Sequence, residues 1–230
     1  PDIIGLQEVL LHQKQGIDAD LLEYRFVGVA RDDGKEAGEF SPVGYRYDRF
    51  HLRDSGTFWL SPTPDTPGKG WDAAYPRIAS WARLKDRKNK RELLVVNTHF
   101  DHVGEVARLE SARQIRRWIA EHRKRNDAVI LLGDFNAPTE SPAYRAIVDI
   151  TGDGTALYDA SGMSDSPHFG PRGTFNAFKI EQVPDWPIDH IFVGDDVKVL
   201  RHATLTQQYG GRLPSDHYPV LADLCIGKRC

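Results

Sequence analysis

Carboxylate, amide and imidazole side chains stand repeatedly at the ends of short apolar runs in this sequence, a placement typical of residues that do chemistry. The runs at residues 3–6, 93–96 and 129–132 each lead into such side chains, and a further group precedes the last apolar run. A buried strand that ends in a polar side chain holds that side chain on a rigid scaffold. The segments concerned are Gln7-Glu8, Asn97-Thr98-His99, Gly133-Asp134-Phe135-Asn136, Ile188-Asp189 and Ser215-Asp216-His217.

The chemistry that these residue types support together is the hydrolysis of a phosphoester. Hard carboxylate ligands such as Glu8 and Asp216 suit Mg²⁺ or Mn²⁺. A cation bound there polarises a phosphoryl oxygen and stabilises the leaving oxygen. A histidine works as a general base near neutral pH when a carboxylate orients its second ring nitrogen. Amides and cationic side chains hold the phosphate oxygens.

Each segment on its own also has an ordinary structural interpretation. A Gln-Glu pair after a strand is commonly a solvated strand end, and Gly-Asp-Phe-Asn is compatible with a turn because Gly, Asp and Asn favour turns. Asp189-His190 is compatible with a surface pair, and Ser215-Asp216-His217 with a hairpin corner. The occurrence of all these segments in one chain, in this order and at strand ends, favours a shared site.

Taken together, these segments resemble the endonuclease/exonuclease/phosphatase superfamily of DNase I-like metal-dependent phosphoesterases. The resemblance extends over essentially the whole chain, and it is specific for the superfamily but not for a substrate. Three further segments resemble a bacterial branch of small members: Phe58-Trp59-Leu60-Ser61, Trp71-Asp72-Ala73-Ala74 and Thr98-His99-Phe100-Asp101-His102.

The resemblance implies a role for each matching residue around the metal and the attacking water. Glu8 matches the metal-binding glutamate of the Gln-Glu motif, and Asp216 matches a second carboxylate near the metal. Asp134 and Asn136 match the pair that orients the nucleophilic water and contacts the phosphate. The implied cofactor is Mg²⁺ or Mn²⁺, and the implied mechanism is in-line attack of water without a covalent enzyme intermediate.

The resemblance also implies roles for the histidines and for residues that contact phosphate. His217 matches the catalytic histidine, and Asp189 matches the carboxylate that orients it. His99 matches a phosphate-contacting histidine, and Glu39 resembles the acidic residue that supports it. The remaining candidates for phosphate binding each have a structural alternative, such as an ion pair or a solvated loop position; they are Arg77, Asn97 and His102.

The pattern of apolar runs predicts many strands and few helices, which is typical of sheets in layers with helices outside. The resemblance implies a four-layer α/β/β/α sandwich with the site at one edge of two facing sheets. Helices are predicted at 9–22, 105–124 and 141–148, and a long loop at 61–76. Strands are predicted at 2–8, 24–30, 43–49, 56–60, 78–86, 92–99, 128–133, 188–193, 197–206 and 218–224.

The start of the sequence departs from the family pattern. Family members have a first strand that places an asparagine near the metal, whereas this sequence opens at Pro1, after that point. We therefore expect residues 1–230 to form a single domain that lacks its first strand. Strands next to an absent strand expose unpaired backbone groups, so we expect upstream residues to be needed for full activity.

Composition and charge limit the choice of function. The 230 residues carry 30 Lys+Arg against 33 Asp+Glu, a formal net charge of −3, and no apolar run is long enough to cross a membrane. Polynucleotide binding relies on neutralising phosphates, so this balance favours a small-molecule or lipid-headgroup phosphoesterase over an endonuclease or exonuclease on DNA or RNA. A catalytically weak binding protein on the same fold is the third alternative.

Three other features each allow two interpretations. The two cysteines form a small disulfide loop or remain unpaired thiols. The arginines of residues 105–125 form a nucleic-acid patch or, given the interleaved glutamates, a solvated helix face. The loop aromatics stack on a base or sugar, or form a satellite apolar cluster. The residues concerned include Cys225, Cys230, Trp71, Tyr75 and Trp186.

Overall fold

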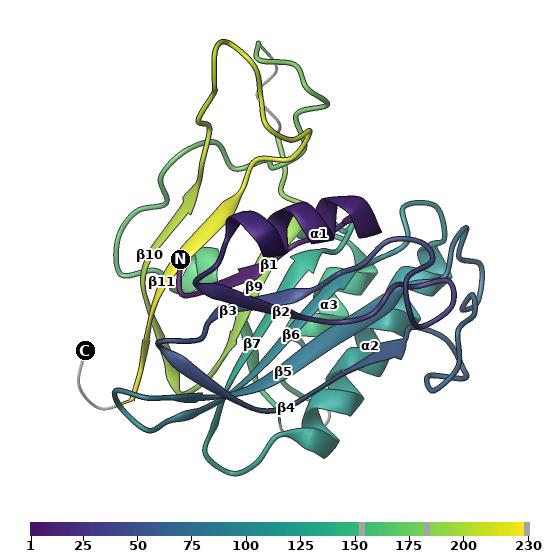
Figure 1. The fold of residues 1–230 in the computed structure, drawn as a ribbon, viewed down its shortest axis with the longest axis horizontal. Coiled ribbons are helices and arrows are strands. Elements are labelled where there is room, and N and C mark those ends of the chain that lie inside the picture. The colour runs from purple at the N-terminus through teal and green to yellow at the C-terminus, as the bar shows by residue number, and fades with distance from the viewer. Residues whose placement is uncertain (152–154, 182–184, 228–230) are drawn as a thin grey trace.

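The computed structural model describes residues 1–151, 155–181 and 185–227, and its centre is a six-stranded sheet (Figure 1). The strand order is β4-β5-β6-β7-β9-β8, in which β6 and β7 are parallel and the other neighbours are antiparallel. A helix connects the parallel pair, as the geometry of a crossover requires. The strands are β4 (Phe50–Trp59), β5 (Ile78–Asp86), β6 (Glu92–His99), β7 (Asp127–Asp134), β8 (Leu157–Asp159) and β9 (Asp189–Gly194).

A second β layer faces this sheet and consists of two smaller sheets. One has the order β1-β3-β2, and the other is the antiparallel pair β10-β11. Aliphatic side chains from both layers fill the space between them, among them Val43, Leu84, Val95 and Val199. The strands are β1 (Ile3–Gly5), β2 (Tyr24–Val27), β3 (Val43–Arg46), β10 (Val197–Thr204) and β11 (Val220–Ile226).

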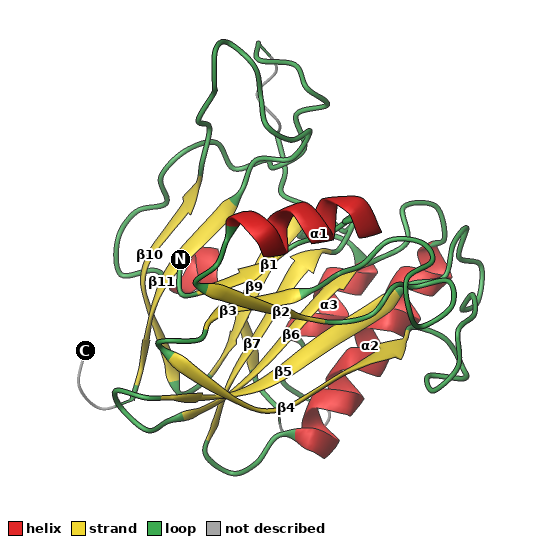
Figure 2. Ribbon diagram, in the orientation of Figure 1, coloured by secondary structure: helices red, strands yellow, loops and turns green. Residues whose placement is uncertain are grey.

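Helices cover the outer faces of both layers, as Figure 2 shows. α2 (Glu105–His122) and α3 (Pro142–Val148) pack against the large sheet through Ile115, Ile119 and Ile147. α1 (Leu11–Asp20) lies outside the second layer, where Leu11 and Ile17 pack against a small cluster of Val9, Ala30 and Phe40. The predicted α/β fold, a four-layer α/β/β/α sandwich, is confirmed. No helix of the described ranges is long and apolar enough to span a membrane.

Several predicted elements have different bounds in the structure. β1 ends at Gly5 rather than at residue 8, and β4 begins at Phe50 rather than at residue 56. β8 and the short helix α4 (Ala160–Met163) were not predicted, because elements this short carry no periodic signal. Cys230, one of the two cysteines for which a disulfide and unpaired thiols are both left open by the sequence, lies outside the described residues.

Close contact between the two β layers explains why β1 carries glycine at its end. A Cβ atom added at Gly5 would lie 1.9 Å from the Leu132 side chain and 2.7 Å from Asn97 Oδ1. Only a residue without a side chain allows β1 to approach β6 and β7 this closely. The approach continues into the turn that carries Glu8, a residue with φ of 58°.

The Phe135 side chain anchors the β7 end to the core, and its removal should cost stability. Its ring is 2% exposed and contacts Phe100 and Phe192 edge-on, with centroids 4.9 and 5.1 Å apart. We expect Phe135→Ala to lower the free energy of unfolding by about 3–5 kcal/mol, measured by urea denaturation. Phe169→Ala, at a ring that is 69% exposed, is the matched control and should change it by less than about 1 kcal/mol. Equal losses in the two variants would contradict the anchoring role.

Candidate active site

The ends of three neighbouring strands bring three predicted residues together at one edge of the large sheet. β6 and β7 are parallel and end in register, so His99 lies beside Asp134. β9 is antiparallel to β7 and begins where β7 ends, which pairs Asp134 with Asp189. Residues in register on adjacent strands point to the same face. Strand register alone therefore places Asp134 between His99 and Asp189.

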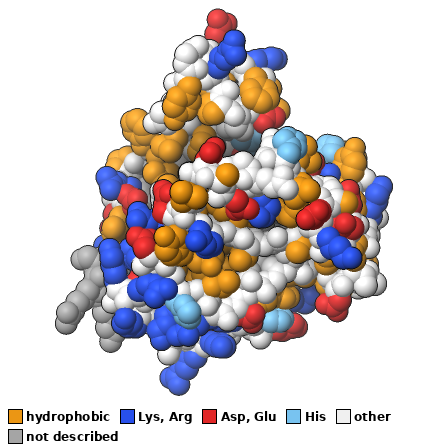
Figure 3. Space-filling model, in the orientation of Figure 1, with side chains coloured by type: hydrophobic (Ala, Val, Ile, Leu, Met, Phe, Trp, Pro, Cys, Tyr) orange, Lys and Arg blue, Asp and Glu red, His pale blue; other side chains and the backbone are white. Residues whose placement is uncertain are grey.

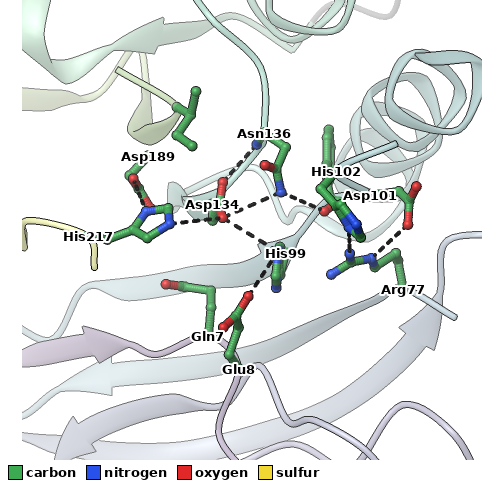
Figure 4. A network of polar contacts seen from close by, with 12 residues as sticks. Gln7, Glu8, Arg77, His99, Asp101, His102, Asp134, Asn136, Asp189 and His217 are labelled. Atoms are coloured by element: carbon green, nitrogen blue, oxygen red, sulfur yellow. Dashed lines mark hydrogen bonds and ion pairs between the residues drawn. The ribbon is translucent and has the colours of Figure 1, made fainter. Parts of the chain in front are cut away.

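A chain of polar contacts runs through these residues (Figure 4). His217 Nδ1 lies 2.7 Å from Asp189 Oδ2, and His217 Nε2 lies 4.0 Å from Asp134 Oδ2. His99 Nε2 lies 3.5 Å from the same Asp134 oxygen and 3.9 Å from Glu8 Oε1. Asp134 thus lies between two imidazoles, and each imidazole has a second carboxylate within reach.

The surroundings raise the pKa of Asp134 and of His217 and lower the pKa of His99. Burial raises the pKa of Asp134, and the nearby charge of Asp189 acts in the same direction. Burial opposes the charged form of His217, but its hydrogen bond to Asp189 and the surrounding carboxylates raise its pKa to about 9. Burial lowers the pKa of His99 well below its usual range. At neutral pH the site therefore holds a protonated His217 and a neutral His99.

Asn136 lies beside Asp134 in a turn that follows β7. Asn136 has a φ of 45°, in the left-handed region that asparagine tolerates better than most residues. Its backbone N–H donates to Asp134 Oδ1 at 2.8 Å, and its Nδ2 donates to the Phe100 carbonyl at 3.1 Å. The turn thus fixes the carboxylate and the amide relative to each other.

Glu8, Glu39 and His99 form a second group on the other side of Asp134. One ligand atom from each lies within 4.8 Å of the other two. Glu39 accepts a hydrogen bond from Arg31 at 2.5 Å, and burial raises the pKa of Glu39 although Arg31 partly opposes this. Two carboxylates beside a neutral imidazole fit a divalent cation, which would relieve their mutual repulsion. The spacing, the donor types and the unfavourable burial of Glu39 make this the candidate metal site.

Arg77 supplies a fixed positive charge next to this group. Its side chain is 4% exposed, Nε donates to Asp101 Oδ1 at 3.2 Å, and Nη2 lies 3.0 Å from His102 Nδ1. Asp101 also accepts main-chain hydrogen bonds from Ala74 and Gly104; with Arg77 these outweigh burial and lower the pKa of Asp101 far below its usual value. Arg77 Nη1 is buried, and none of the described residues accepts a hydrogen bond from it.

The sequence matches the model of the endonuclease/exonuclease/phosphatase family over residues 1–217. The chain belongs to this family. No curated protein matches it in sequence. A mannosyl-6-phosphatase from Bacteroides thetaiotaomicron is 41% identical, with a TM-score of 0.93 over 98% of this chain and 85% of that chain. Family membership confirms the predicted enzyme class, a phosphoester hydrolase.

Two further structures show how far the similarity extends. A functionally unknown conserved protein from Enterococcus faecalis is 30% identical, with a TM-score of 0.88 over 98% of this chain and 86% of that chain. A TDP2 from D. rerio, complexed with a single-stranded DNA product, is 18% identical, with a TM-score of 0.73 over 98% and 86%. The second likeness concerns the fold alone.

Two residues that the family resemblance assigned to the site have other surroundings in the structure. Asn97 is fully buried: its Oδ1 accepts from Gln7 Nε2 at 2.7 Å, and its Nδ2 donates to the Leu6 and Pro42 carbonyls. The polar atoms of Asn97 thus hold the segment that leads to Glu8, and its phosphate-binding role stays a prediction. Asp216 belongs to neither of the two acidic groups found among the described residues; its metal-binding role stays a prediction.

Two buried residues that the sequence did not single out hold the histidine–carboxylate pair of this family member together. Thr174 Oγ1 accepts from the backbone N–H groups of Ile188 and Asp189, and the Thr174 carbonyl accepts from Tyr218 at 2.7 Å. Asn176 donates from its backbone to the Asp216 carbonyl at 2.7 Å. One segment thus binds both the start of β9 and the loop of His217. It lies in an irregular loop, where no periodic pattern marks it.

The pairing of His217 with Asp189 has a direct spectroscopic consequence. In the metal-free protein His217 should titrate at about pH 9. Asp189→Asn should lower that pKa, because it removes the negative charge that counteracts burial. Burial disfavours the charged ring. Histidine-selective NMR across a pH series measures both values. Asp195→Asn, in the β9–β10 turn, should leave the pKa unchanged. An unaltered His217 pKa in Asp189→Asn would contradict the pairing.

Proposed function

We propose that this protein is a divalent-cation-dependent phosphomonoesterase that acts on a small phosphorylated sugar, with Mg²⁺ or Mn²⁺ as its cation. The observation that carries the proposal is the contact between two groups: a candidate cation site at Glu8, Glu39 and His99, and the Asp134, Asp189 and His217 group beside it. Identity of 41% with a mannosyl-6-phosphatase over nearly the whole chain supports the sugar phosphate.

The cation would be held by Glu8, with Glu39 and His99 as its neighbours. When bound, it polarises a phosphoryl oxygen and stabilises the charge on the leaving oxygen. Arg77 lies on the same side and has one buried N–H without an acceptor among the described residues. It adds positive charge for the phosphate, which in a monoester carries more negative charge than in a diester. The greater negative charge of a monoester gives it the stronger attraction to Arg77, so binding of a monoester is favoured over binding of a nucleic-acid backbone.

Asp134, Asn136 and His217 then act on the water and on the phosphate. Asp134, in its ionised form, accepts the proton of the attacking water, and its raised pKa makes that carboxylate a stronger base. The water oxygen bonds to phosphorus as the bond to the leaving oxygen breaks, and solvent protonates that leaving oxygen. His217, kept protonated by Asp189, donates a hydrogen bond to a phosphoryl oxygen, and Asn136 donates a second one. Charge building on the phosphoryl group is thus met by fixed donors.

Hydrolysis of a substrate panel tests the proposal. The panel contains mannose 6-phosphate, glucose 6-phosphate, bis(4-nitrophenyl) phosphate and single-stranded DNA and RNA, each with Mg²⁺, Mn²⁺ or a chelator. We expect release of phosphate from the sugar esters, only with a cation present. Faster cleavage of the diester or the nucleic acids would overturn the monoester assignment, and full activity with the chelator would overturn the cation dependence.

Glu8→Gln checks where the cation binds. Loss of the carboxylate charge should raise the cation concentration needed for half-maximal activity, because Mg²⁺ is commonly held by one or two carboxylates. Glu36→Gln, at an exposed glutamate on the loop that leads to Glu39, is the matched control and should behave like the wild type. An unchanged cation titration in Glu8→Gln would remove Glu8 from the cation site.

A further inference from the structure

An exposed phenylalanine stands directly against the catalytic histidine. Phe175 lies between Thr174 and Asn176, whose side chains are 1% and 0% exposed, whereas the Phe175 side chain is 45% exposed. Alternate residues of an extended segment point to opposite sides. The buried neighbours thus turn the Phe175 ring outward, where it meets the His217 ring edge-on with centroids 5.1 Å apart.

The backbone that carries Phe175 is fixed on both sides. Phe175 pairs with His217 in an antiparallel bridge, and the bonds of Thr174 and Asn176 described above tie the segment to β9 and to the His217 loop. The chain then passes through Ala177 and Phe178 at φ values of 52° and 59°. Two successive left-handed residues with side chains are uncommon and persist only where the surroundings enforce them. The Phe175 ring is therefore presented on a rigid support.

Tyr75, an exposed aromatic side chain beside His102 and Arg77, is less available for a ligand. Tyr75 is 50% exposed, but the Arg31 guanidinium lies 5.0 Å from its ring centroid, and His102 is stacked on it at 6.0 Å. Phe175, by contrast, has His217 as its one ring contact among the described residues. In the space-filling view, apolar side chains gather on the lobe that carries this segment (Figure 3). Of these two rings, the Phe175 ring is therefore the one that is available to contact a ligand.

We propose that Phe175 is a specificity-determining residue that stacks against the ring of the substrate's sugar. The inference rests on the proposed function, in which His217 donates to a phosphoryl oxygen. In a primary sugar phosphate the ring begins one methylene group beyond the ester oxygen, so a phosphate at His217 places the ring next to Phe175. The C–H groups of a pyranose form an apolar face that an aromatic ring can cover. The site thereby selects cyclic over acyclic phosphomonoesters.

The test compares a cyclic and an acyclic substrate on the same variants. Mannose 6-phosphate and glycerol 3-phosphate present the same phosphate to the same His217, but only the first presents a ring. We expect Phe175→Ala to lower kcat/KM for mannose 6-phosphate about 3- to 10-fold, the equivalent of one aromatic contact, mainly through KM. Glycerol 3-phosphate should be hydrolysed within about 2-fold of the wild-type rate. Phe175→Trp should restore the preference for the cyclic ester.

Phe169→Ala is the matched control, because Phe169 is also an exposed phenylalanine but its backbone pairs with Ala203 of β10 rather than with His217. It should alter neither substrate, and the pH profile of Phe175→Ala should match the wild type. Equal losses on both esters, or a shifted pH profile, would show that Phe175 acts only by supporting His217. An unchanged preference in Phe175→Ala would show that the ring makes no contact. Wild-type protein that hydrolyses neither ester would overturn the proposed function and this inference with it.

Discussion

Asp134→Ala should lower kcat by about 10²- to 10⁴-fold, the usual contribution of a positioned proton acceptor, with little effect on the fold. Asp134 is the residue that both imidazoles approach, at 3.5 Å from His99 and 4.0 Å from His217. Of the described residues next to it, neither Asn136 nor Asp189 replaces it, because Asn136 is uncharged and Asp189 is already bonded to His217. Single-turnover and steady-state kinetics with saturating cation measure the loss.

Asp196→Ala provides the matched control for this prediction. Asp196 follows β9 at the far end of the same sheet and pairs with Arg91 at 2.5 Å, so its loss should leave kcat unchanged. Far-ultraviolet circular dichroism of both variants should match the wild type. A value of kcat within about 3-fold of the wild type in Asp134→Ala, far below the contribution of a proton acceptor, would remove Asp134 from the reaction.

The same carboxylate should limit stability while it serves catalysis. Its pKa is raised in the folded protein, so the folded state binds more protons than the unfolded state above the unfolded pKa. Stability from this group is therefore lost as pH rises from the unfolded value near 4 towards the folded value. Asp134→Asn in a chelator at pH 7.5 should then have a melting temperature at or above that of the wild type. A lower melting temperature would mean that Asp134 stabilises the fold.

The sequence predicted the central part of the fold well because β5, β6, β7 and α2 have clear hydrophobic patterns. It also placed His99, Asp134 and Asp189 at strand ends, and strand register then determines their contacts. The bonds of Asn97 could not be predicted, because they depend on how closely β1 approaches the large sheet, which is a tertiary property. Local sequence carries no signal for such cross-layer contacts.

The residues that support the site were the hardest to predict. Thr174 and Asn176 lie in an irregular loop and act through main-chain groups of segments far away in sequence. Asp101 was noted only as part of a motif, yet it organises the loop of Ala74 and the side chain of Arg77. Such roles depend on which backbone N–H groups face a carboxylate, and composition and spacing do not encode that.

Asp189 and His217 should behave as one catalytic unit. The hydrogen bond between them is 2.7 Å long, and it fixes the ring orientation and favours the protonated form. The function proposed for the charged ring is to stabilise charge that builds up on the phosphoryl group, which is greatest in the transition state. Asp189→Asn and His217→Ala should therefore each lower kcat strongly, by about 10²- to 10³-fold as for loss of one preorganised donor, and change KM little.

The double variant Asp189→Asn/His217→Ala decides between a unit and two independent residues. If Asp189 acts only through His217, then its loss has no further effect once the imidazole is gone, and the double variant should be scarcely slower than the slower single variant. Losses that multiply would mean that Asp189 acts on the substrate or cation by itself, as its place in an acidic group with Asp134 also allows. The alternative in which His217 is a plain phosphate ligand makes a different prediction: Asp189→Asn would leave kcat nearly intact and His217→Ala would mainly raise KM. Steady-state kinetics of the four proteins, at saturating cation and one pH below 8, separates these outcomes.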